Sequence, residues 1–160
     1  MKPIMELKFY ILSIALILSS CKAKQEANVI SGYYNYDTEC VNSYNDGSVL
    51  VKAWGKGTDQ RSAENNARKN AVDDLLFKGI SNGNSCNIRP IISNPNTKRD
   101  QQDFFESFYS NGGDYNNFIS DANTKLIKQK ELRVGEKAFE IMVNVDVRSL
   151  KEYFKDKFNN

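Results

Sequence analysis

The sequence predicts an α+β domain with two layers, in which an antiparallel sheet of three to four strands is packed by an alanine-rich helix and shorter helices. Two segments alternate apolar and polar residues with the period of a strand, at residues 48–56 and 138–147. Between them, alanines recur at every fourth residue, which is the spacing of one helix face. A chain of 160 residues suits one such domain, which we place at residues 38–160.

The first elements are predicted to form a hairpin. Asn45, Asp46 and Gly47 indicate a tight turn, because an Asp-Gly pair tolerates positive φ. The flanking segments Thr38–Tyr44 and Ser48–Lys56 carry aromatic and β-branched residues, so we expect them to pair as strands. The second strand would place Val49, Val51 and Ala53 on one face.

A helix follows this hairpin. Either Thr58 or Asp59 provides an N-cap, and Gly79 provides a stop. A stripe of mostly small residues would let the helix lie close on a sheet. This stripe consists of Ala63, Ala67, Ala71 and Leu75.

The second half of the chain predicts a loop, short helices, a second hairpin and a closing helix. Residues 81–100 contain prolines and many asparagines, which are typical of a long loop. The aromatic residues of 101–119 have helical spacing and are interpreted as core. Thr124–Val134 is charged, as is typical of an edge strand, and residues 148–158 are amphipathic. The last strand would bury Phe139, Ile141, Val143, Val145 and Val147.

The N-terminus has the pattern of a secretory signal. Lys2 and Lys8 precede an apolar run from Phe9 to Leu18, which is too short to span a bilayer. We therefore expect residues 1–20 to be a signal peptide that is removed.

The residues that end this run resemble the lipobox of bacterial lipoproteins. Leu18, Ser19 and Ser20 lead to Cys21, and the resemblance implies that the Cys21 thiol carries a diacylglycerol. Two or three acyl chains hold a protein stably on a membrane. Residue 22 is lysine and not aspartate, so sorting by analogy favours the outer membrane, on either its periplasmic or its outer side. Residues 21–37 would be a tether.

Two further cysteines, Cys40 and Cys86, are predicted to form a disulfide, because paired thiols are common in small domains outside the cytoplasm. The alternatives are two separate buried thiols, or a reactive cysteine. The chain has no histidine to activate a thiol and no C-x-x-C motif.

The segment from Trp54 to Asp59 raises the question of nucleotide binding. A Walker loop requires glycine where Leu50 stands, and a dinucleotide fingerprint requires glycine where Gln60 stands. We therefore interpret Gly55 and Gly57 as the residues that end a strand and let a helix begin close above it.

No catalytic constellation is visible, so we expect a protein that is not an enzyme and has no cofactor. The absence of histidine removes most acid–base and metal chemistry. Asp37, Glu39 and Asp46 are candidate calcium ligands, but they lack the spacing of a calcium loop. A net charge of +2 gives no indication of nucleic acid.

The strand "VKAWGKG", the helix "SAENNARKNAVDDLLFKGI" and the closing "VNVDVRSLKEYF" resemble small envelope lipoproteins. These group with the N-terminal domain of flagellar assembly protein T, and the resemblance spans residues 48–158. It implies a non-enzymatic, membrane-attached interaction module. We expect an envelope protein as its partner, and the two failed glycine motifs predict that it binds no nucleotide. We expect residues 81–121 to provide the contact surface. The alternative is a module that binds a glycan or peptide through Trp54 and the tyrosines at 33, 34 and 36.

Overall fold

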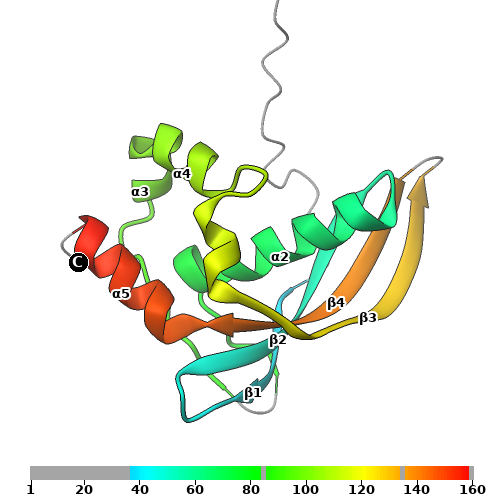
Figure 1. Cartoon of the computed structure of the whole chain (residues 1–160), viewed down its shortest axis with the longest axis horizontal. Helices are drawn as coiled ribbons and strands as arrows, with labels where there is room; N and C mark the ends of the chain where they lie inside the picture. The colour runs from blue at the N-terminus through cyan, green and yellow to red at the C-terminus, as the bar shows by residue number, and fades with distance from the viewer. Residues whose placement is uncertain (1–36, 84–85, 134–135, 159–160) are drawn as a thin grey trace, which may run out of the picture.

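The computed structural model describes residues 37–83, 86–133 and 136–158, and it is an α+β domain as predicted (Figure 1). The predicted signal peptide, Cys21, the tether as far as residue 36 and the tyrosines at 33, 34 and 36 lie outside the described residues. The elements in chain order are β1 (Glu39–Ser43), β2 (Ser48–Gly57), α2 (Gln60–Phe77), α3 (Thr97–Asp100), α4 (Gln102–Phe108), the 3-10 helix η1 (Asp114–Phe118), β3 (Ile119–Arg133), β4 (Glu136–Asp146) and α5 (Val147–Phe158).

The four strands form one antiparallel sheet in the order β1-β2-β4-β3. Helix α2 lies across one face, and no helix of the described part of the chain covers the opposite face (Figure 1). Strand β3 is at the edge, as predicted from its charge, although it begins at Ile119 and not at Thr124. The first hairpin is confirmed, with Glu39 opposite Lys52 and Ser43 opposite Val49.

Helix α2 packs on the sheet through the predicted stripe. Ala63, Ala67, Ala71 and Leu75 are all fully buried. Asp59 is the N-cap, and its carboxylate accepts a hydrogen bond from the Ser62 N–H at 2.8 Å. Gly79 follows the helix with φ of +74° and donates its N–H to the Asp74 carbonyl, so it ends the helix as expected.

The core face of β4 is also confirmed, with Phe139, Ile141, Val143 and Val145 buried. Val147 is buried too, but it begins α5 and does not continue the strand. The strand ends because Asp146 caps the helix: its carboxylate accepts from the Ser149 N–H at 3.0 Å and from the Ser149 hydroxyl at 2.7 Å.

A second part of the core lies where α4, η1 and α5 meet the end of α2. Phe105 stacks on Phe154 with ring centroids 5.9 Å apart, and it also meets Phe77 edge-on at 5.2 Å. The residues of the 81–121 insert that are buried in this core are Ile92, Phe105, Phe108, Tyr109, Tyr115 and Phe118. The aromatic residues of the insert are therefore core residues, as interpreted, except that Phe104 is only partly buried against this core.

Candidate functional site

The glycine pair lies directly beneath α2. A Cβ atom added to Gly55 would stand 2.1 Å from the Ala63 carbonyl oxygen and 2.2 Å from the Ala67 nitrogen. At Gly57 it would stand 2.6 Å from the Ala63 nitrogen. Both glycines are required because helix backbone and strand backbone are in contact, which confirms that they let the helix begin close above the strand.

The amino end of α2 is closed by the protein itself. The Asp59 carboxylate occupies the position at which a helix N-terminus would hold an anion. The hydrogen bond from the Ser62 backbone N–H lowers the pKa of this carboxyl. The segment from Trp54 to Asp59 thus has the geometry of a scaffold corner and not of a phosphate cradle.

Two asparagines on α2, whose roles no sequence pattern indicates, bond to the part of β2 that lies beyond its pairing with β1. Among the described residues, strand β1 pairs with β2 only as far as Lys52. The Asn70 amide donates to the Trp54 carbonyl at 2.7 Å, and the Asn66 amide donates to the Lys56 carbonyl at 2.8 Å. Asn66 and Asn70 are four residues apart, a rise of about 6 Å along a helix, and Lys56 and Trp54 are two residues apart, about 6.6 Å along a strand. The spacing of the two donors on α2 therefore matches that of the two acceptors on β2.

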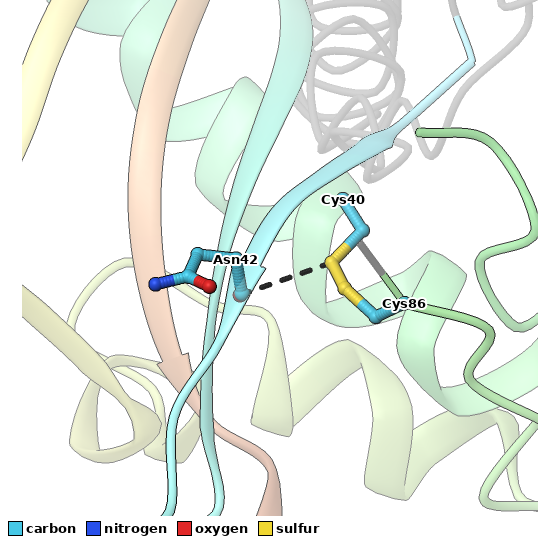
Figure 2. Close-up of a disulfide and its surroundings, with 3 residues drawn as sticks. All are labelled: Cys40, Asn42 and Cys86. Atoms are coloured by element: carbon cyan, nitrogen blue, oxygen red, sulfur yellow. Dashed lines mark hydrogen bonds between the residues drawn. A yellow bond between two sulfur atoms is a disulfide. The ribbon is translucent and has the colours of Figure 1, made fainter. Parts of the chain in front are cut away.

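The predicted disulfide is present as a Cys40–Cys86 pair (Figure 2). The two Cα atoms are 5.9 Å apart, which is within the range of disulfides. The Cys40 N–H also donates to the Asn82 carbonyl at 2.8 Å, so the loop after α2 is held to β1 at two points. The Cys40 sulfur is 3.8 Å from the Asn42 carbonyl oxygen. This contact is not a hydrogen bond, because a disulfide sulfur carries no proton to donate.

The adjacent carboxylates Asp73 and Asp74 are buried, and each has its own partners. Lys98 Nζ lies 2.5 Å from Asp73, and Lys78 Nζ lies 3.0 Å from Asp74. The Thr38 hydroxyl also donates to Asp74. Two carboxylates that are neutralised by different cations do not form an acid–base pair, so their role is to tie α3 and the start of the domain to α2.

The candidate calcium ligands are not brought together. Asp37 accepts from the Asn82 amide at 3.2 Å, Glu39 pairs with Lys52 at 3.5 Å, and Asp46 accepts from the Ser48 N–H at 2.9 Å. Among the residues with described positions, no group of three or more His, Cys, Asp or Glu could hold a metal ion.

Trp54, the residue named for ligand binding, lies on the sheet face opposite α2. Its neighbour Gly55 faces the helix, and successive strand residues point to opposite faces. Trp54 pairs across the strands with Glu140, which is 5% exposed.

No protein-family model matches the chain, and no curated protein or solved structure is significantly similar to it. Within the ranges that the structure describes, no helix is long and apolar enough to cross a membrane.

Proposed function

We propose that the protein is a lipid-anchored lipoprotein of the bacterial envelope, attached through Cys21 and acting as a non-enzymatic interaction or assembly module. The observation that carries this proposal is the lipobox-like Leu18–Cys21 at the end of a short apolar run. We include in this proposal that the protein is related to small envelope lipoproteins. The outer membrane is the proposed site because residue 22 is lysine.

The folded part supports an interaction role in two ways. The buried carboxylates Asp73 and Asp74 are in ion pairs that join elements of the scaffold, which is a structural use of charge. The chain from Cys21 to Asp37 can extend by at most on the order of 50 Å, enough to let a small domain meet a partner away from the lipid surface.

The anchor is tested by fractionating cells that express Cys21→Ser. We expect this variant to leave the membrane fraction and to lose incorporation of a labelled fatty acid. The double variant Cys40→Ser/Cys86→Ser is the matched control, since it changes cysteines without changing the lipobox, and it should remain in the membrane fraction. Retention of Cys21→Ser in the membrane would refute the lipid anchor.

The partner is sought by crosslinking in intact cells followed by affinity purification of the crosslinked species. A specific envelope protein crosslinked to the wild type, and lost with Cys21→Ser, is the expected result. Crosslinks that do not depend on the anchor would argue against assembly at the membrane.

Binding of a glycan or peptide is the second candidate function. It is favoured by one observation: Trp54 lies on a sheet face that no helix of the described chain covers.

A further inference from the structure

The proposed tether enters the folded domain where the chain is tied to α2 and to the loop that follows it. Asp37, the first described residue, accepts a hydrogen bond from the side-chain amide of Asn82 at 3.2 Å. The Thr38 hydroxyl donates to the carboxylate of Asp74, near the end of α2. Both ties lie just before β1, so they stand on the path of any tension that arrives along the tether.

The next ties meet at Cys40, the second residue of β1. Its N–H donates to the Asn82 carbonyl at 2.8 Å, and its sulfur is bonded to Cys86 (Figure 2). Its backbone also lies against Gly83, since a Cβ added there would stand 2.1 Å from the Cys40 carbonyl oxygen. The covalent tie is therefore placed at the start of the first strand, beside the entry of the tether.

The bridge changes the route that tension takes through the chain. Without it, tension would pass along β1, a strand of five residues that pairs, within the described part of the chain, with β2 alone. A strand this short is held by few hydrogen bonds. With the bridge, tension passes from Cys40 to Cys86 through the two sulfur atoms, and residues 41–85 carry none of it. These residues contain the rest of β1, β2 and α2.

The segment that follows the bridge is bonded to the end of α2 and to the residues just after it. Ile80 and Ile88 exchange a pair of backbone hydrogen bonds, at 2.8 and 2.9 Å. The Ile92 N–H donates to the Leu76 carbonyl at 2.8 Å, and the side chains of both residues are buried in the core. Tension that crosses the bridge is therefore delivered to the core and not to an edge strand.

We propose that the Cys40–Cys86 bridge is a mechanical clamp, which carries tension from the tether past the first hairpin and α2 into the core. A domain that is held by its lipid at one end and by a partner at its surface is pulled between the two, and in this respect the inference rests on the proposed function. The pulling experiment needs neither lipid nor partner. Its failure is therefore distinguishable from failure of the anchor, which fractionation of Cys21→Ser tests.

The test is single-molecule force spectroscopy on the chain from residue 21 to residue 160 with Cys21→Ser, which leaves Cys40 and Cys86 as its only cysteines. Peptide tags at both ends are coupled enzymatically to handles, and constant force is applied with and without a dithiol reductant. Reduction should shorten the lifetime of the folded domain at least about tenfold, the equivalent of one or two backbone hydrogen bonds. It should also add on the order of 150 Å to the contour length released, because the cysteines are separated by 46 residues.

A second pulling direction separates the clamp from overall stability. One tag is inserted after Gly112, where an added Cβ meets nothing within 4 Å, and the other stays at the carboxyl end, so tension does not pass through the bridge. The chain-entropy model assigns the effect of a bridge to the unfolded state, so reduction should change this lifetime by less than about twofold. Equal shortening in both directions would overturn the clamp, and so would an unchanged lifetime in the tether direction. If the tag after Gly112 prevents folding, as judged by circular dichroism, the exposed Asn94 takes it.

Two variants locate the clamp. Cys40→Ala/Cys86→Ala should behave without reductant as the reduced chain does, and if it does not fold, reduction of the folded parent chain supplies the same comparison. Asp37→Ala removes a tie that tension meets before the bridge, and it should leave the lifetime of the oxidised chain unchanged. A loss for Asp37→Ala as large as that caused by reduction would place the clamp at Asp37 and reject the bridge.

Discussion

The side-chain amide of Asn70 donates a hydrogen bond to the main-chain carbonyl of Trp54, 2.7 Å away. Trp54 lies beyond the last residue of β2 that the described part of β1 pairs with. Asn66 repeats the contact one helical turn earlier, at the carbonyl of Lys56. Helix α2 therefore supplies hydrogen-bond donors to two carbonyls of β2 beyond the described part of β1, which occupies backbone acceptors that could otherwise pair with another chain.

Replacing Asn70 with alanine should lower the free energy of unfolding by about 1–2 kcal/mol, because a carbonyl at a covered edge loses its donor. Urea unfolding followed by circular dichroism measures the change. Asn65→Ala on the same helix is the control. Alanine favours helix more than asparagine does, so this variant should be neutral or slightly more stable. Equal destabilisation by both variants would contradict a role for the edge contact.

The glycine beneath α2 gives a second prediction. Gly55→Ala should cost about 2 kcal/mol or more, because its Cβ would stand 2.1 Å from helix backbone and the helix must shift. Gly112→Ala is an informative comparison: a Cβ there meets nothing within 4 Å, but φ is +79°. We expect it to cost only about 1 kcal/mol from backbone strain. Thermal or urea unfolding of both variants checks this, and a smaller loss for Gly55→Ala would refute close packing.

The sequence predicted those parts of the fold whose patterns are local. The apolar alternation of β4 and the stripe of three alanines and Leu75 on α2 each lie within a single element. Both predictions were correct, since these residues are buried. The roles of Asn66 and Asn70 were missed because an asparagine inside a helix looks like a solvated residue. Their partners, Lys56 and Trp54, lie 10 and 16 residues earlier in a strand, and only the tertiary structure shows the contacts.

The boundary between β4 and α5 was missed although a local signal exists. Both long helices begin with the pattern D-x-R-S, at Asp59–Ser62 and at Asp146–Ser149, and in both the aspartate caps the helix. The alternation that continues to Val147 concealed the second cap. The aromatic insert required more than local pattern, since Phe105 finds its stacking partner in Phe154, far along the chain.

The Cys40–Cys86 bridge should stabilise the domain by about 3–4 kcal/mol, because it closes a loop across a sequence separation of 46 residues. Cys40→Ala/Cys86→Ala should unfold at lower urea concentration than the wild type, and reductant should lower the wild type to that value without affecting the variant. Peptide mapping under non-reducing conditions should show the linked pair. Alkylation of both thiols in the native, unreduced protein would refute the bridge.

Three tyrosines should make stability fall at high pH, because burial raises the pKa of Tyr109, Tyr115 and Tyr153. Burial and the hydrogen bond to Asp114, 2.9 Å away, raise the pKa of Tyr153 to about 12, and burial followed by the charge of Asp73 raises the pKa of Tyr109 well above its usual value. A group whose pKa is higher in the folded state binds its proton more tightly there. Its contribution to stability is therefore complete below the unfolded pKa of about 10, and for Tyr153 it is lost as pH rises to about 12.

The alkaline prediction is checked by recording tyrosinate absorbance and unfolding together as pH is raised. Tyr109 should ionise only as the domain unfolds, since it is buried beside the Asp73 carboxylate. Tyr153→Phe should reduce the pH dependence between about 10 and 12, because phenylalanine has no proton to lose, and Tyr115, whose pKa burial also raises, should account for part of what remains. Tyr44→Phe at a more exposed position is the control and should leave that pH dependence unchanged. If Tyr109 ionised in the folded domain with an ordinary pKa, it would not be buried against α2 as the structure shows, and the packing of α4 on α2 would have to be revised.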